Sequence, residues 1–226
     1  GLILLCLLFI NQSFGRIITF DFAGLAGSEA SANSNYNDAN LTSSTITRGS
    51  GVTSGANADR FNSTNWTTAS SVDNTDYLQF TITPNAGYQF SVSSILIQHQ
   101  RSGTGPINFV LRSSLDSYTA NLGGIHTIAD VTTTQSYTFT FTQSNSSAAV
   151  TYRVYAYQSE AAAGTWGIGD GTGNDIVVSG TVSAISCSAP TTQASSITFS
   201  AIDLTQMTVN WTNGYGSKRV VIMNTA

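Results

Sequence analysis

The sequence predicts an all-β protein: a jelly-roll-like β-sandwich followed by part of an immunoglobulin-like sandwich. Charged residues make up only 9% of the 226 residues, whereas 41% are hydrophobic and 10% aromatic, which supplies a core but few helix-forming side chains. Apolar and polar residues alternate along several segments that turn residues separate. No window of helical length shows apolar residues at helical spacing. Strands therefore account for the pattern best.

The chain begins with an apolar segment, residues 1–15, that ends in small residues before Arg16. This pattern is typical of a signal peptide, and because no basic start precedes it, we expect a truncated one. The segment is too short to span a bilayer as a helix. The alternative is a first buried strand. Export predicts a secreted or cell-surface location, where Cys187 would be the single remaining cysteine and would need a partner elsewhere.

The first module, residues 16–184, contains most of the predicted strands. Leu78, Phe80 and Ile82 alternate with polar residues, and the turn at 84–87 leads into a second strand, which predicts a hairpin. The polar stretch 26–75 is expected to hold short strands at best. The expected strands of this module are 17–22, 77–83, 88–98, 107–112, 137–141, 150–157 and 176–183.

A boundary is predicted where Cys-Ser-Ala-Pro follows the last of these strands. Residues 185–226 then contain three predicted strands, at 197–199, 207–211 and 219–222, and Trp211 alternates with apolar neighbours as a core residue would. An immunoglobulin-like sandwich needs about 100 residues, so this second module is expected to be incomplete.

Arg101, Arg112 and Asp116 form the densest group of charged residues, around a Gly-Thr-Gly-Pro turn. A guanidinium can bind a carboxylate or a ligand hydroxyl through two parallel hydrogen bonds. The group is therefore either a salt bridge that pins the turn or a ligand site, and we favour the salt bridge between Arg112 and Asp116.

A second candidate site combines aromatic rings with a cation. Arg153, Tyr155 and Tyr157 share one face of a predicted strand, and Trp166 follows in a glycine-rich loop. Sugar rings stack on exposed aromatic rings while their hydroxyls bind polar groups. The pattern predicts a weak glycan-binding face, and the alternative is a packed layer of the sandwich.

The loop 164–175 offers oxygen ligands from Asp170, Asn174 and Asp175. Calcium binds six to eight oxygens, so these three residues define at most part of a calcium site, and an ordinary turn is the alternative. The glycines of this loop precede a strand, whereas a phosphate-binding loop precedes a helix, which excludes a nucleotide site. We expect no other cofactor.

The remaining residues do not form a catalytic pattern. His99 and His126 are isolated from each other and from Cys187 in the sequence, and Glu29 and Glu160 have no evident carboxylate partner. No Gly-x-Ser-x-Gly motif is present. A net charge of −4 with eight scattered basic residues argues against nucleic acid as a partner. We therefore expect a protein that is not an enzyme.

Several segments carry a resemblance to a known group of proteins. These are RSGTGPINFVLRSSLDSY (101–118), TYRVYAYQSEAAAGTWGI (151–168), IVVSGTV (176–182) and Phe20-Asp21-Phe22. Together they resemble a β-rich N-terminal module of large bacterial secreted and surface proteins. Residues 187–226 resemble the start of a fibronectin type III-like repeat. The resemblance implies export and a multidomain parent, and it transfers no catalytic residue.

We thus expect a non-enzymatic extracellular module of a larger secreted or cell-surface protein. Its expected role is spacing or adhesion with weak glycan binding, so its partner would be an extracellular polysaccharide or a cell surface. The alternative is the accessory N-terminal region of a secreted hydrolase, a nuclease or protease, whose catalytic domain lies beyond Ala226.

Overall fold

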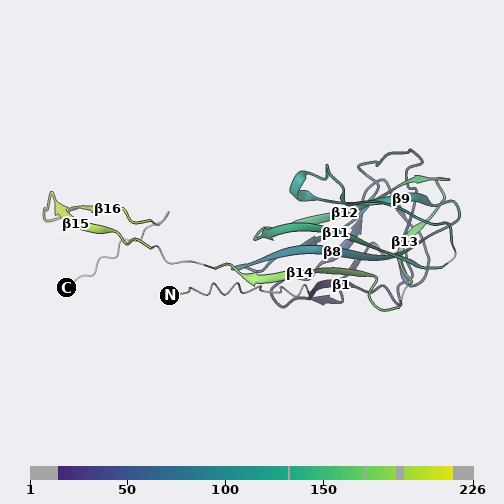
Figure 1. The fold of residues 1–226 in the computed structure, drawn as a ribbon, viewed down its shortest axis with the longest axis horizontal. Coiled ribbons are helices and arrows are strands. Elements are labelled where there is room, and N and C mark those ends of the chain that lie inside the picture. Colours follow the sequence, from purple (N-terminus) through teal and green to yellow (C-terminus); the bar gives the residue numbers. More distant parts are fainter. Residues whose placement is uncertain (1–14, 132, 171, 187–190, 216–226) are drawn as a thin grey trace, which may run out of the picture. The chain divides into compact units, whose positions relative to one another are not determined.

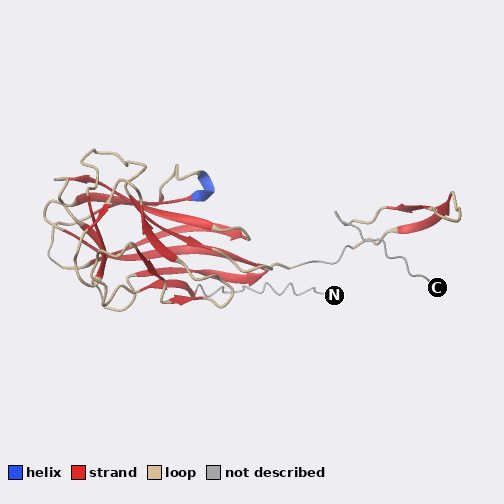
Figure 2. Ribbon diagram, turned by 180° about the vertical axis from the view of Figure 1, so that it is seen from behind, coloured by secondary structure: helices blue, strands red, loops and turns tan. Residues whose placement is uncertain are grey.

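The computed structural model describes residues 15–131, 133–170, 172–186 and 191–215 (Figure 1). The chain divides into two compact units, Gly1–Ile185 and Ser186–Ala226. Strands dominate the described residues, and the short 3-10 helix η1 (Ser114–Asp116) is drawn in blue in Figure 2. The signal peptide predicted over 1–15, except Gly15, lies outside the described residues, as do Cys187 and the strand predicted at 219–222.

The first unit consists of two antiparallel sheets. One sheet has the order β3 (Tyr36–Asn37), β1 (Gly15–Phe20), β14 (Ile176–Ala184), β8 (Tyr88–Arg101), β13 (Trp166–Gly169), β6 (Arg60–Thr64) and β5 (Thr53–Ser54), and β11 (Gln135–Ser146) also pairs with β8. The other sheet has the order β10 (Leu122–Thr127), β9 (Pro106–Ser113), β12 (Val150–Ser159), β7 (Tyr77–Ile82), β4 (Thr45–Arg48) and β2 (Ser31–Asn33).

The core lies between these two sheets, which makes the unit a β-sandwich. Alternate residues of β7 and β12 are buried, and the Phe80 and Tyr152 rings stack with centroids 5.6 Å apart. In β8 the buried positions change from even to odd numbers between Val92 and Ile95. Both strands beside β8 shift register at this point, as at a β-bulge. The all-β class is confirmed, whereas the jelly-roll and fibronectin type III connectivities stay predictions.

The predicted hairpin of 77–83 with 88–98 is wrong. β7 pairs with β12 and β4 in one sheet, and β8 pairs with β11, β13 and β14 in the other. The turn that contains Pro84 therefore carries the chain across the core from one layer to the other. Apolar and polar residues alternate along these strands whether they form a hairpin or lie in different sheets, because each strand buries one face in either case.

The polar stretch 26–75 contains five short strands, β2 to β6, as expected. The half-buried side chain of Arg48 holds this stretch together. Its guanidinium lies 3.7 Å from the Phe61 ring centroid and donates to the carbonyls of Gly27 (3.1 Å) and Asn62 (2.7 Å). Burial lowers the pKa of Arg48 to about 10. The Arg48 guanidinium thus helps to order loops that have little regular secondary structure.

The chain enters the sandwich near the end at which it leaves it. Gly15 pairs with Gly180 on β14, and Ala184 pairs with Tyr88, the first residue of β8. We call the end at which Tyr88 and Ala184 lie the proximal end, and Gly15 lies four residues along β14 from it. Arg101, at the other end of β8, lies beside β13 at what we call the distal end (Figure 1).

The second unit contains an antiparallel pair, β15 (Ser195–Ser200) and β16 (Thr208–Thr212). The prediction that Trp211 fills a core is wrong for the described residues, because its side chain is 37% exposed and its Nε1 donates to Asn213 Oδ1. The described part of this unit has no second layer against which the ring could pack. Across the described ranges, no helix is both long and apolar enough to cross a bilayer.

Candidate functional site

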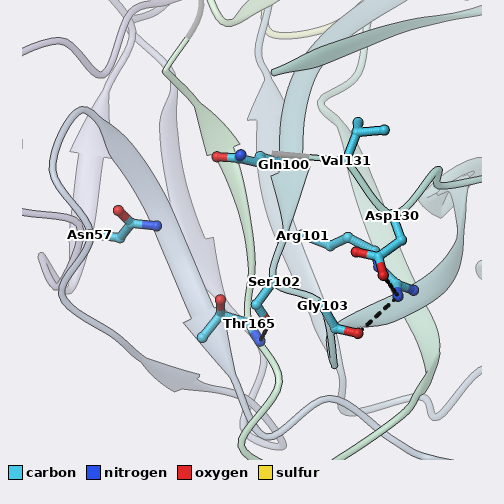
Figure 3. Close-up of a pocket in the computed structure, with 8 residues that line it drawn as sticks. All are labelled: Asn57, Gln100, Arg101, Ser102, Gly103, Asp130, Val131 and Thr165. Carbon is cyan, nitrogen blue, oxygen red and sulfur yellow. Dashed lines mark hydrogen bonds and ion pairs between the residues drawn. The ribbon is translucent and has the colours of Figure 1, made fainter. Parts of the chain in front are cut away.

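A cavity of about 470 Å³ opens at the distal end of the first unit (Figure 3). Five segments contribute to its wall: the end of β8, the turn that follows it, the residue before β13, the segment after β10 and the loop between β5 and β6. The lining residues are Asn57, Gln100, Arg101, Ser102, Gly103, Asp130, Val131 and Thr165.

Arg101 anchors one side of this distal cavity. Its side chain is 4% exposed and forms ion pairs with Glu160 and with Asp130, whose Oδ2 lies 3.7 Å from Nη2. The guanidinium also donates to the carbonyls of Gly103 (3.2 Å) and Pro106 (3.3 Å). Arg101 therefore fixes the turn and the Asp130 carboxylate, and two carboxylates balance its charge.

Arg60 anchors the opposite side. Its Nη1 donates to Asn57 Oδ1 at 2.7 Å, and its Nη2 binds both Gln100 Oε1 and Asp170. The residue is 9% exposed, so its charge is largely removed from water and depends on these partners. Arg60 thereby positions two amide side chains in the wall of the cavity.

Ser102 and Thr165 are joined at the floor between these two sides. The Ser102 amide donates to the Thr165 carbonyl, and the Thr165 amide donates to Ser102 Oγ, both at 2.9 Å. A Cβ at Gly105 would lie 2.2 Å from the Thr165 carbonyl oxygen, so only glycine permits this approach. Rigid backbone thus holds Ser102 and Thr165 together in the lining of the cavity.

The predicted arginine cluster is not one site. Arg112 lies on β9 and donates to Asn121 Oδ1 (2.8 Å) and to the Tyr118 carbonyl (3.1 Å). Asp116 accepts from the backbone amides of Thr119 (3.2 Å) and Ala120 (2.8 Å). The expected Arg112–Asp116 bridge is absent from the ion pairs of the described residues, because the carboxylate caps its own turn.

The predicted glycan-binding face is buried. Arg153, Tyr155 and Tyr157 share the outer face of β12, but Tyr155 is 1% and Tyr157 7% exposed. The Arg153 guanidinium lies 3.9 Å from the ring centroids of both Tyr77 and Tyr118, which cover this face. The alternative of a second packed layer is the correct interpretation, since a sugar cannot stack on covered rings.

Trp166 lies in the other sheet, on β13 and not in a loop. Its ring is fully buried and meets Trp66 edge to face, with centroids 5.5 Å apart. The indole Nε1 donates to His99 Nδ1 at 3.4 Å. Trp166 is thus part of the core and does not extend the face formed by Arg153, Tyr155 and Tyr157.

The two histidines are not isolated from each other. Phe109 pairs with His126 across β9 and β10, and it also contacts His99 from the opposite sheet. The two imidazole rings consequently lie with centroids 5.3 Å apart. Burial, together with the charge of His126, lowers the pKa of His99 to about 3, and burial lowers the pKa of His126.

The three predicted calcium ligands each bind a different part of the protein. Asp170 pairs with Arg60, Asn174 Oδ1 accepts from Asn35 Nδ2 at 2.8 Å, and Asp175 Oδ2 accepts from the Phe22 amide at 2.7 Å. Within the ranges that the structure covers, no group of three or more His, Cys, Asp or Glu side chains could hold a metal ion. These contacts fit the alternative of a structured turn.

Comparison with known proteins does not assign this cavity. No family model, no curated protein and no solved structure matches the chain. The distal cavity and the strand topology are therefore the features that bear on function.

Proposed function

We propose that the chain is an exported, non-enzymatic display module of a larger secreted or cell-surface protein. The observation that carries the proposal is the position of the strand ends: Ala184 lies at the proximal end, Gly15 pairs with Gly180 four residues from it, and the cavity lies at the distal end. A sandwich attached in this way projects its distal loops away from the chain that holds it. Export is supported by the apolar segment at 1–15.

The internal use of polar and aromatic residues supports the same role. The half-buried Arg48 and the buried Arg60 and Arg101 tie loops to strands, and Trp66 and Trp166 pack in the core. Arginine and tryptophan often bind ligands in other proteins, but in this unit these side chains hold loops and strands together. A stiff body holds its outer loops at a defined distance from an attachment point, as a display module must.

The test compares the accessibility of the two ends on a cell surface. The full chain, with Cys6→Ser and Cys187→Ser, is anchored through its C-terminus, and single cysteines are introduced by Ala163→Cys at the distal end and Ala86→Cys at the proximal end. Both alanines are exposed, so the substitutions form a matched pair. A bulky maleimide polymer should label the distal cysteine as fast as in the free protein and the proximal one several-fold more slowly.

Labelling of both variants in solution provides the control for intrinsic reactivity. Equal shielding of the two cysteines on the surface, or stronger shielding of the distal one, would overturn the proposed display role.

A further inference from the structure

We propose that the distal cavity binds a neutral sugar, one hexose unit of a glycan. The inference rests on the proposed function, because a displayed module needs a ligand site at its projecting end. It assigns binding to residues other than the buried ring face of β12. The size, the hydrogen-bonding groups and the charge of the cavity all favour such a ligand.

The size fits a small ligand. A volume of about 470 Å³ lies within the roughly 300–1,000 Å³ of typical small-molecule sites. Residues from five segments converge on it, and ion pairs and backbone contacts hold those segments in place. The cavity is therefore formed before a ligand arrives, which reduces the entropic cost of binding.

The lining groups match sugar hydroxyls. Each hydroxyl of a sugar is both a donor and an acceptor, so it needs a mixed wall. Ser102 and Thr165 supply hydroxyls, Asp130 supplies a carboxylate that is 62% exposed, and Asn57 supplies an amide whose oxygen already holds Arg60. In Figure 3 these side chains stand around one hollow, with Asn57 across from Ser102 and Arg101.

The charge favours an uncharged ligand. Arg101 is balanced by Asp130 and Glu160, and Arg60 is balanced by Asp170, so the two guanidinium groups face three carboxylates. An anionic ligand would meet the exposed Asp130 without an uncommitted cation. A metal cation would find a single carboxylate in the lining, which is fewer than a hard cation requires.

The expected affinity is low. None of the lining residues is aromatic, and Val131 is the apolar side chain among them, so ring stacking adds nothing. Hydrogen bonds that replace bonds to water contribute little each, which gives a dissociation constant of about 1–10 mM.

The experiment titrates the full chain with D-glucose, D-galactose, D-mannose and N-acetylglucosamine, followed by saturation-transfer NMR and calorimetry. Glucuronate and glucosamine serve as anionic and cationic probes. At least one neutral sugar should bind saturably, and Asp130→Ala and Thr165→Val should each weaken it about tenfold, the effect of losing one well-placed hydrogen bond. Thr138→Val, an exposed threonine on β11, is the matched control and should leave binding unchanged.

Three results would overturn the inference: no saturable binding of any neutral sugar up to about 100 mM, binding of glucosamine alone, or binding that both cavity variants retain in full. Circular dichroism of each variant confirms that the fold is intact. If no neutral sugar binds but the two cysteines are labelled as expected, the sugar site is refuted and the display role stands. If the distal cysteine is shielded on the cell surface, the display role is refuted, whether or not a sugar binds.

Discussion

The two units show the same sequence pattern with opposite outcomes. In β7 of the first unit, Leu78, Phe80 and Ile82 alternate with polar residues and are buried. In β15 of the second unit, Ile197 and Phe199 alternate in the same way and remain 60% and 58% exposed. Alternation shows that a strand has an apolar face, and a second layer decides whether that face becomes a core.

The largest expected effect comes from the tryptophans of the two units. Trp166→Ala leaves a cavity between the sheets and should lower the free energy of unfolding by about 3–5 kcal/mol. Trp211→Ala should change the stability of the first unit by less than about 0.5 kcal/mol. Urea unfolding followed by circular dichroism measures both. Equal effects would show that the comparison between the units is wrong.

Next in size is the loss of a buried guanidinium. Arg101→Ala removes the partner of Glu160 and Asp130, and because these carboxylates are 46% and 62% exposed they regain water. The cost should therefore be about 2–3 kcal/mol, below that of breaking a fully buried pair.

Arg112→Ala is the matched comparison on β9 and should cost about 1 kcal/mol, since Arg112 makes hydrogen bonds at a partly exposed position. Thermal unfolding ranks the two arginine variants. A larger loss for Arg112→Ala than for Arg101→Ala would refute the assignment of Arg101 as the internal anchor.

A smaller effect follows from pH. The pKa of His99 is about 3 in the fold and about 6.5 when unfolded. Above pH 6.5 His99 is neutral in both the folded and the unfolded state, so it does not make stability depend on pH. As pH falls below 6.5, His99 of the unfolded chain binds a proton that the folded protein does not bind. Stability is therefore lost progressively between about pH 6.5 and pH 3, by about 2 kcal/mol from pH 7 to pH 5.

His99→Phe places a non-titrating ring among Phe109, His126 and Trp166 and should flatten much of this dependence. Denaturant midpoints at several pH values provide the measurement. A wild-type midpoint that stays constant from pH 7 to pH 5 would contradict a buried, neutral His99.

The smallest effect is expected at Leu204, which is fully exposed in the second unit. Leu204→Ser should change the free energy of unfolding of the first unit by less than about 0.5 kcal/mol, as measured by urea unfolding. A clear loss of stability would indicate that Leu204 packs against a partner surface.

The sequence was sufficient to predict the elements that depend on local pattern. The strand around Leu78 and the short strands of 26–75 agree with the alternation and with the polar composition. Which strands pair is not local information. The same alternation allowed a hairpin between 77–83 and 88–98, whereas the structure places these strands in different sheets.

The site residues show the same limit more sharply. Local spacing suggested an Arg112–Asp116 bridge, but Asp116 binds the backbone amides three and four residues further along the chain. The His99–His126 contact depends on strand pairing across two sheets, and no spacing in the sequence indicates it. The distal cavity likewise unites Asn57 with Asp130, which only the tertiary fold brings together.

Hydrogen exchange of the full chain tests the central comparison most directly. If burial between two layers distinguishes the units, amides of β8 and β12 should exchange only through global unfolding, whereas amides of β15 and β16 should exchange near the unprotected rate. Comparable protection of β15 and β8 in the same experiment would contradict the account.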